Sequence, residues 1–392
     1  MSERVQMICE HINGMGGSVS DLALVYGVSR KTAHKWIKRY EAGSWEALRD
    51  GSRARRTHPN AVSPEVVKKV LEWRERKPLW GAPKLRQKLL EIYPEGCPAE
   101  STVSAILKRH GLTRILSRAR HATPTRDPLR HAQAPNEVWT IDVKGDFEMG
   151  DRVRCWPLTL CDAYSRYFLL CQAYVHPPGF KSTQRAMERI FQELGMPAAI
   201  RSDNGTPFAS CGLGGLTQLS AWWVRLGIRL ERIEPGHPEQ NGRHERAHRT
   251  LKEATARPPR ADFKAQQEAF NEFQREYNFE RPHEALGQKT PGQIYTASAR
   301  IYPPKLPEQQ GYPRDWQRRR VSSAGQISHC GQKFRINDAL ANQDVGLKPV
   351  GEGLWAVYFE HLQIGLYDER QGHVKALPRL ADPKTIEEDY SI

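Results

Sequence analysis

A change of pattern near residue 136 constrains the fold of this 392-residue chain more than any other feature. Beyond it, VWTIDVKGDF and VRCWPLTLCDAYSRYFLLCQAYV are rich in β-branched and aromatic residues, and DAYSR is typical of a hairpin turn. Helices and strands are predicted to alternate after these segments: helix KSTQRAMERIFQELG, strand AAIRSDNG, helix LTQLSAWWVRLG, strand RLERIE and helix NGRHERAHRTLKEATA. Three antiparallel strands followed by alternating helices and strands predict an α/β core with a mixed five-stranded sheet.

The segment before this core has helical periodicity. In residues 18–41 the apolar positions recur at helical spacing with a break at Gly27, and Ser29 is a suitable N-cap for the second helix. This order is typical of a helix-turn-helix module, whose second helix enters a groove of DNA. An ordinary helical hairpin with a solvated basic face is the alternative. The residues that would meet the groove and its phosphates are Arg30, Lys31, His34, Lys35 and Lys38.

Three more helices are predicted over residues 63–112, and they suggest a second helix-turn-helix module, with a single helical dimerisation domain as the alternative. Beyond residue 313, short strand-like segments alternate with turn residues and predict a small β-barrel. The expected domains are helix-turn-helix modules at 1–60 and 61–113, a basic linker at 114–135, the α/β core at 136–297, a linker at 298–313 and the barrel at 314–380.

Charge is unevenly distributed along the chain. The formal net charge is +14, which indicates a polyanionic partner such as nucleic acid or a membrane surface. Residues 1–130 hold 25 Lys and Arg against 13 Asp and Glu, residues 131–300 hold 22 against 20, and the remainder holds 12 against 12. The surface that binds the partner is therefore expected to begin in the first third of the chain.

Seven cysteines occur without a CxxC pair or a companion histidine spacing. This pattern predicts neither a zinc site nor a disulfide framework, and it is typical of a reducing, intracellular compartment. The longest apolar runs are too short to span a bilayer, so no membrane segment is expected. We expect a cytoplasmic protein associated with the nucleoid.

Acidic residues in distinctive local sequences are the candidate catalytic groups. Asp142 lies inside a predicted strand among apolar neighbours, a costly position unless the carboxylate is paired or liganded. Asp203 ends another strand in SDNG, where a carboxylate is well placed for an α/β active site. Two such aspartates with a glutamate could hold paired Mg²⁺ ions for phosphodiester cleavage. Asp162 is a rival, but its hairpin position with Ser165 and Arg166 suggests turn capping and an ion pair.

Two glutamates compete for the third position. Glu239 lies at a spacing from Asp203 that is familiar from strand-transfer enzymes. The stretch PGHPEQNGRHE resembles the integrase pattern Pro-x-x-Pro-x-x-x-Gly-x-x-Glu, in which the glutamate lies on a helix, and here that glutamate is Glu245. Helical geometry puts His248, Arg249 and Lys252 on the same face as Glu245, where these cations could hold DNA phosphate. We therefore choose Glu245, with Arg249 and Lys252 as DNA-binding residues; a helix ion pair between Glu245 and Arg249 is the alternative.

The motifs together resemble a known family. They are W-x-x-D at 139–142, DAYSR at 162–166, SDNG at 202–205, NGRHER at 241–246 and YNFERPHEAL with TP at 277–291. As a set they resemble bacterial insertion-sequence transposases with an integrase-type DDE core, which are close in pattern to retroviral integrase catalytic domains. The resemblance covers roughly residues 136–295. It implies a ribonuclease H-like fold, two Mg²⁺ or Mn²⁺ ions, and Asp142, Asp203 and Glu245 as catalytic metal ligands.

The same resemblance implies a reaction and its partners. The enzyme would hydrolyse phosphodiester bonds at transposon ends and transfer the freed 3′-hydroxyls to target DNA, acting as a homo-oligomer on double-stranded DNA. No zinc-binding HHCC module precedes the core, so the helix-turn-helix modules would bind the terminal repeats. A DNA-binding regulator with an inactive core is the alternative, and an RNA–DNA hybrid nuclease is a weaker one.

Two further segments have open roles. In the box around Asn278 and Arg281, the arginine could contact phosphate, or the box could lock the last helix of the core in place. Trp222 and Trp223 are expected in the core or in a subunit contact rather than as base-stacking platforms.

Overall fold

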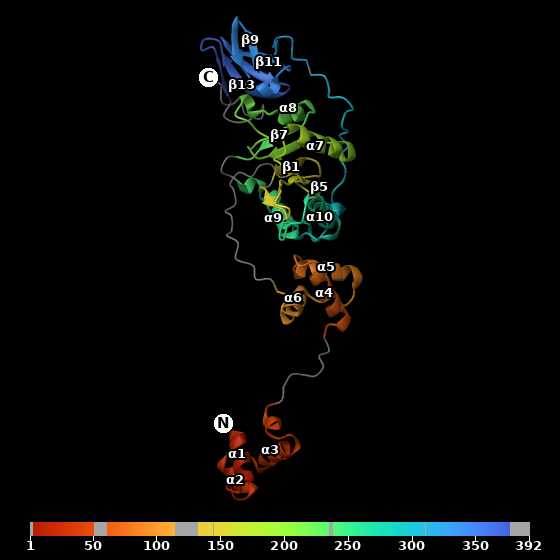
Figure 1. Ribbon diagram of the computed structural model, residues 1–392, viewed down its shortest axis with the longest axis vertical. Coiled ribbons are helices and arrows are strands. Elements are labelled where there is room, and N and C mark those ends of the chain that lie inside the picture. The colour runs from red at the N-terminus through yellow and green to blue at the C-terminus, as the bar shows by residue number, and fades with distance from the viewer. Residues whose placement is uncertain are drawn as a thin grey trace. The chain divides into compact units, whose positions relative to one another are not determined.

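The computed structural model describes residues 3–50, 61–113, 132–143, 145–234, 238–309 and 311–376 (Figure 1). The chain divides into two compact units, Met1–Ser63 and Pro64–Ile392. The predicted basic linker falls outside the described residues up to residue 131. No helix in the described part of the chain is long and apolar enough to cross a membrane.

The first unit is a small helical bundle. Its helices are α1 (Glu3–Ile12), α2 (Val19–Val25) and α3 (Arg30–Gly43), followed by a 3₁₀ turn, η1 (Trp45–Leu48). Gly27 has a φ of 61°, which lets the chain turn sharply between α2 and α3. The Ser29 hydroxyl caps α3 by accepting a hydrogen bond from the Thr32 amide at 3.2 Å. The predicted helix-turn-helix arrangement is confirmed.

The second unit begins with three more helices, as predicted: α4 (Pro64–Arg76), α5 (Ala82–Ile92) and α6 (Glu100–Arg109). Trp80, between α4 and α5, donates its indole N–H to Glu276 Oε1 at 3.0 Å. Lys77 Nζ lies 2.8 Å from Glu276 Oε2. These contacts join the helical segment to the end of the α/β core.

The mixed five-stranded sheet predicted for the core is confirmed. Its strand order is β5-β4-β1-β6-β7, with β4 antiparallel to β1 and β5, and with β6 parallel to β1 and β7. A short ladder of β2 (Phe147–Glu148) and β3 (Arg154–Cys155) lies outside this sheet. The strands are β1 (Val138–Val143), β4 (Leu158–Asp162), β5 (Phe168–Gln172), β6 (Ala199–Ser202) and β7 (Arg229–Arg232).

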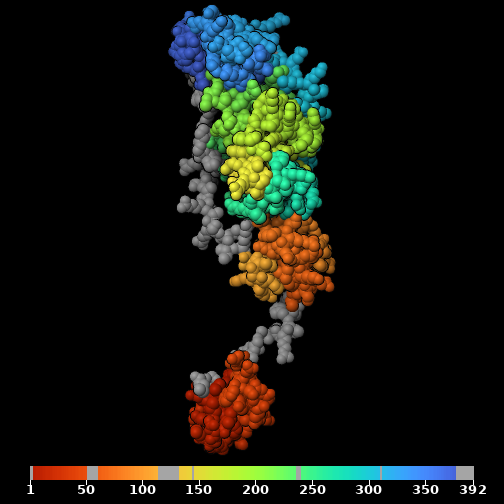
Figure 2. Space-filling view, in the orientation of Figure 1, coloured from red at the N-terminus to blue at the C-terminus, as the bar shows by residue number. Residues whose placement is uncertain are grey.

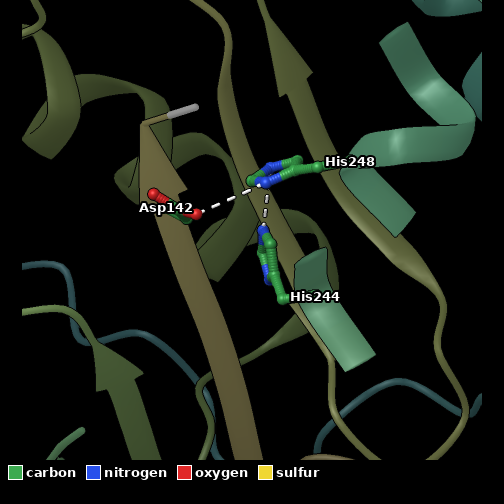
Figure 3. A group of neighbouring side chains, drawn as sticks. All are labelled: Asp142, His244 and His248. Carbon is green, nitrogen blue, oxygen red and sulfur yellow. Dashed lines mark hydrogen bonds and ion pairs between the residues drawn. The ribbon is translucent and has the colours of Figure 1, made fainter. Parts of the chain in front are cut away.

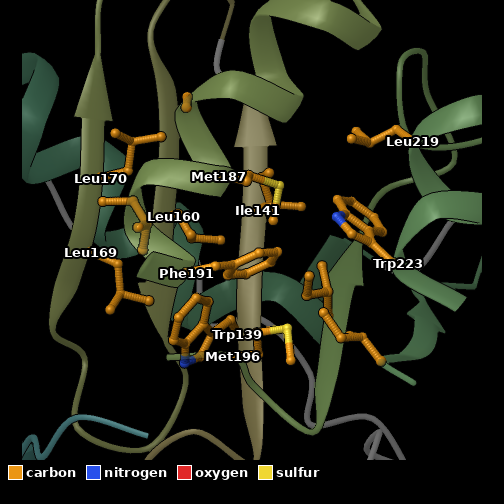
Figure 4. Close-up of a cluster of buried hydrophobic side chains, with 14 of the residues drawn as sticks. Trp139, Ile141, Leu160, Leu169, Leu170, Met187, Phe191, Met196, Leu219 and Trp223 are labelled. Carbon is orange, nitrogen blue, oxygen red and sulfur yellow. The ribbon is translucent and has the colours of Figure 1, made fainter. Parts of the chain in front are cut away.

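One face of the sheet is apolar and is covered by α7 (Phe180–Leu194) and α8 (Gln218–Arg225) (Figure 4). Trp139 and Ile141 of β1 pack here against Phe191 and Trp223. Successive strand residues point to opposite faces, so Thr140 and Asp142 lie on the other side of β1. Trp222 and Trp223 are both buried in this cluster, so their assignment to the core is confirmed.

The opposite face is covered by α9 (Gly242–Thr255) and α10 (Phe263–Arg275), which continues into a π-helical turn, η4 (Glu276–Glu280). Asn278 in this turn is buried and bonds the backbone of Phe168 on β5 twice, accepting from its N–H and donating to its C=O, each at 2.9 Å. These bonds favour the interpretation that the Asn278–Arg281 box locks the last helix of the core onto the sheet.

The C-terminal segment consists mainly of strands, as predicted, with a 3₁₀ turn, η7 (Asp338–Leu340). Its five-stranded antiparallel sheet has the order β14-β13-β12-β11-β8, and β9 and β10 form a separate hairpin. Its apolar side packs with residues of α8. Figure 2 shows the C-terminal segment, in blue, against the green part of the core. The described strands do not close into a barrel. The strands are β8 (Gln317–Arg320), β9 (Gln326–His329), β10 (Gln332–Arg335), β11 (Asp344–Gly351), β12 (Leu354–Phe359), β13 (Leu362–Asp368) and β14 (His373–Ala376).

Candidate active site

The carboxyl ends of β1 and β6 bring two predicted aspartates to neighbouring strands. The parallel register pairs Thr140 with Arg201, so Asp142 and Asp203 each lie two residues beyond the same pair. Asp142 is still within β1 and is 9% exposed, whereas Asp203 directly follows β6 and is half-buried. This edge, where the strands end, is where open α/β sheets bind their ligands.

Two histidines of α9 lie beside Asp142 (Figure 3). His248 Nδ1 is 3.3 Å from Asp142 Oδ2, and the Nε2 atoms of His248 and His244 are 3.1 Å apart. Both histidines are almost fully buried. A buried carboxylate is costly without a polar neighbour, and the His248 imidazole lies within ion-pair distance of this one.

Two threonines of the sheet hold these imidazoles. Thr140 Oγ1 lies 2.6 Å from His244 Nδ1 and 3.3 Å from Cys161 O. Thr159, opposite Asp142 on β4, contacts His244 Nε2 at 2.8 Å and also His248 Nε2. The side of α9 that faces the sheet is therefore fixed by hydrogen bonds and not by apolar packing alone.

Glu245 lies in the first turn of α9 and is half-buried. Each residue of an α-helix is rotated by about 100° about the helix axis from the one before it. Glu245 and Lys252 therefore lie at the edge of the helix face that carries His244 and His248. The ammonium group of Lys252 lies near the end of β1. Its Nζ atom is 4.0 Å from the position that a Cβ atom on Gly145, just past β1, would occupy. Arg249 is exposed.

The loop after β6 holds Asp203 in a turn. Asp203 Oδ1 accepts the amide N–H of Gly205 at 3.1 Å, and the Asn204 side chain donates to Ile233 O at 2.7 Å. Arg201, on the preceding strand, forms an ion pair with Glu231 at 2.7 Å. These contacts fix the loop relative to β7.

Of the predicted trio of Asp142, Asp203 and Glu245, Asp142 alone belongs to a close group of possible metal ligands among the described residues. Asp142, His244 and His248 form a group whose donor atoms all lie within 4.8 Å of one another. Neither Asp203 nor Glu245 belongs to such a group in the described part of the chain. The side chain of the rival Glu239 lies outside the described residues, so the choice between the glutamates stays a prediction.

Asp162 has the contacts of a turn-capping residue. Its carboxylate accepts the Ser165 amide at 2.7 Å, the Ser165 hydroxyl at 2.6 Å and the Asn136 amide at 2.8 Å. Burial raises the pKa of Asp162, although these hydrogen bonds oppose the shift. Arg166 meets Asp162 through its backbone amide, and no side-chain ion pair between them is found among the described contacts. The expected ion pair is thus replaced by backbone hydrogen bonds.

His244 and His248 are the site residues that sequence reasoning missed or misplaced. We expected His248 on a cationic surface facing DNA, but it is 1% exposed and faces Asp142. The signal in the sequence was the i, i+4 spacing of the two histidines, which puts them on one helix face. Only the packing of α9 on β1 and β4 shows which face is buried.

The basic residues predicted to bind DNA are at the surface. Arg30, Lys31, His34, Lys35 and Lys38 are all exposed along α3. This exposure permits contact with phosphate, while their binding role stays a prediction.

Comparisons with known proteins agree with the resemblance seen in the sequence. Family models described as integrase core domain match residues 132–238 and 226–291. A helix-turn-helix domain model matches residues 3–56, and a homeodomain-like domain model matches residues 32–107. Integrase core domain models thus match the central part of the chain, and helix-turn-helix and homeodomain-like models match the part before it.

Curated relatives come from bacterial insertion elements. The chain is 29% identical over 178 residues to an uncharacterized 31.7 kDa protein of insertion element IS407 from Burkholderia multivorans, covering 43% of this chain and 58% of that protein. It is 28% identical over 179 residues to an uncharacterized 39.2 kDa protein of insertion element IS476 from Xanthomonas euvesicatoria, covering 45% and 49%. The chain thus spans about half the length of these relatives.

Solved structures with some likeness are retroviral. The HTLV-2 integrase catalytic core domain in complex with magnesium is 18% identical, with a TM-score of 0.33, and the match covers 42% of this chain and 98% of that chain. A chain of the simian T-cell lymphotropic virus intasome in complex with a PP2A regulatory subunit is 17% identical, with a TM-score of 0.37, over 80% of this chain and 99% of that one.

Proposed function

We propose that this protein is a DNA transposase. It binds the terminal repeats of its element, hydrolyses phosphodiester bonds at the ends and transfers the 3′-hydroxyl ends to target DNA. The observation that carries the proposal is the matching position of Asp142 and Asp203 at the ends of two neighbouring parallel strands, beside the helix that holds Glu245. The integrase core match over these residues and the insertion-element relatives support it.

The donor set suits two Mg²⁺ or Mn²⁺ ions held by Asp142, Asp203 and Glu245. Carboxylates are hard oxygen ligands of the kind these ions prefer, whereas imidazole suits softer metals. His244 and His248 are bonded to threonines of the sheet, so we assign them to orienting Asp142. When bound, the two ions would polarise the scissile phosphate and stabilise both the attacking and the leaving oxygen.

The remaining residues would hold the DNA. Lys252, near the end of β1, and the exposed Arg249 would attract backbone phosphate beside the carboxylates. The exposed basic residues of α3 would bind the terminal repeats in the manner of a recognition helix. Pairing two ends for joining requires at least two copies of the core, so a homo-oligomer assembled on DNA is part of the proposal.

The test is strand transfer on duplex DNA carrying the ends of the element, with Mg²⁺ or Mn²⁺. Asp142→Asn should reduce both nicking and joining by more than about 100-fold, while binding to the ends stays at the wild-type level. Loss of a residue that merely supports a metal ligand can already reduce activity by up to about 100-fold, so loss of a ligand should reduce it further. Asp151→Asn, in an exposed turn, is the matched control and should keep full activity.

The same assay separates the two glutamates and the alternative function. Glu245→Gln should behave like Asp142→Asn, whereas Glu239→Gln should stay active; the reverse result would move the third ligand to Glu239. A wild-type protein that binds the ends but never joins them with either metal would reject the transposase proposal in favour of a DNA-binding regulator.

A further inference from the structure

A second group of metal-ligating side chains lies in the C-terminal β segment, away from the integrase core. His329 ends β9, Cys330 follows it in the turn to β10, and Glu369 follows β13. Glu369 Oε1 lies 3.1 Å from His329 Nε2 and 3.2 Å from Cys330 Sγ. The three donor atoms lie within 4.8 Å of one another. We call these three residues the hairpin cluster.

The backbone at Cys330 is unusual for a cysteine. His329 pairs with Gln332, so Cys330 and Gly331 form a two-residue hairpin turn with φ angles of 46° and 76°. Such turns favour Asn, Asp or Gly at the first position, since a side chain with positive φ costs about 1–2 kcal/mol. Strained residues of this kind concentrate at functional sites. The turn holds the thiol beside the imidazole and the carboxylate.

The other two members are held in place by aromatic residues. The His329 side chain is buried, and its ring meets Trp355 at 4.7 Å and Tyr367 at 5.7 Å in edge-to-face contacts. The Trp355 indole N–H donates to Glu369 Oε1 at 2.7 Å. Imidazole and carboxylate are therefore oriented before any ligand arrives, which lowers the entropic cost of binding.

Arg319 lies near the cluster, but the hydrogen bonds described for its side chain go elsewhere. Arg319 directs its guanidinium to Ser328 O and Arg318 O, each at 3.0 Å. Among the described residues, the ion pair found for Glu369 is with His329. A carboxylate and a thiol that can lose its proton thus face one another with a neighbouring imidazole, and together they can balance a divalent cation.

We propose that the hairpin cluster binds Zn²⁺ or a similar transition-metal ion through Cys330 Sγ, a ring nitrogen of His329 and a Glu369 oxygen. Tetrahedral zinc with bonds of 2.0–2.3 Å separates its ligands by about 3.3–3.6 Å, so the observed 3.1 and 3.2 Å need only a small expansion. Thiolate and imidazole select such ions over Mg²⁺. The thiol proton would leave to solvent, and water would take the fourth position.

This site departs from the sequence-based expectation of no zinc, because that expectation considered only spacing along the chain. Glu369 lies 39 residues from Cys330 along the chain, and only the fold brings the two side chains together. A bound ion would join the β9–β10 hairpin to the end of β13, two parts that belong to separate ladders. The ion would therefore stabilise the C-terminal segment and is independent of the proposed strand transfer.

Titration of the full chain with Co²⁺ tests the site directly. A thiolate ligand gives an intense near-ultraviolet charge-transfer band that oxygen ligands of the integrase core cannot produce, and Zn²⁺ should abolish it whereas Mg²⁺ should not. Cys330→Ser should remove the band, and Glu369→Gln should weaken Co²⁺ binding at least about tenfold. Cys211→Ser, which removes another exposed thiol, is the matched control and should leave the band unchanged.

A second measurement guards against misfolded variants. Zn²⁺ should raise the thermal midpoint of the wild-type chain and of Cys211→Ser but not that of Cys330→Ser, all three having the same circular dichroism without metal. The proposal is overturned if wild-type protein gives no charge-transfer band, or if the band survives Cys330→Ser.

Discussion

The two faces of the central sheet differ in what holds them together. On the α7–α8 face, Trp139 and Ile141 of β1 meet aromatic and aliphatic side chains. On the α9 side, the alternate residues of the same strand, Thr140 and Asp142, meet imidazoles: Thr140 Oγ1 lies 2.6 Å from His244 Nδ1, and Asp142 Oδ2 lies 3.3 Å from His248 Nδ1. The period of two along one strand thus assigns packing to one face and polar chemistry to the other.

This difference predicts how the two faces respond to substitution. Dispersion and burial are non-directional, so the apolar face tolerates changes that conserve volume and is damaged by cavities. The polar face needs particular partners, because a buried donor or carboxylate left alone is costly. Substitutions on the first face should therefore act on stability, and those on the second mainly on the geometry of Asp142.

Trp223→Ala should give the largest change in stability. Trp223 is 1% exposed and stacks with Phe208 at 6.3 Å, so truncation leaves a large cavity worth about 3–5 kcal/mol of unfolding free energy. Urea unfolding followed by circular dichroism measures the loss. Trp223→Phe, which fills most of the volume, should lose clearly less; equal losses would show that this face is not held by packing.

His248→Asn should act on the reaction more than on the fold. Its loss releases Asp142 from the imidazole, and outer-shell partners of metal ligands typically contribute 10–100-fold, so joining should fall by about that factor. A strand-transfer assay against His176→Asn, an exposed control, measures the effect. The metal concentration needed for half-maximal joining should rise. Unchanged joining and metal requirement would contradict a positioning role for His248.

A further effect concerns pH and accumulates gradually. Burial lowers the pKa of His283, near the α10 end of the polar face, to about 3. The pKa of this imidazole in the unfolded chain is about 6.5. Between pH 6.5 and about 3 the imidazole is therefore protonated in the unfolded chain and neutral in the folded chain, so the free energy of unfolding falls as the pH drops through this range. The slope is at most about 1.4 kcal/mol per pH unit.

His283→Gln checks this pH effect. Urea unfolding at several pH values should show a shallower decline below pH 6.5 for the variant than for the wild type, because the glutamine does not titrate. Parallel declines would mean that other groups account for the acid sensitivity of this face.

The order of helices and strands could be predicted from the sequence because each element depends on local patterns. Helical periodicity and the Ser29 cap gave the helix-turn-helix, and the β-branched segments gave the mixed sheet. Asp142 could be singled out because a carboxylate in an apolar strand needs a partner. Closure of the C-terminal strands into a barrel could not be predicted reliably, since it depends on pairing between distant edges.

Sequence by itself determined the helical front segment, the mixed sheet of the core, the two aspartates at strand ends and the basic surface of α3, because propensity, capping and charge are properties of neighbouring residues. Tertiary structure alone decided that His248 faces Asp142 rather than DNA, and that Glu369 meets Cys330. These contacts join residues far apart in the chain, and their partners follow from how strands pair and which helix face is buried. No local pattern contains that information.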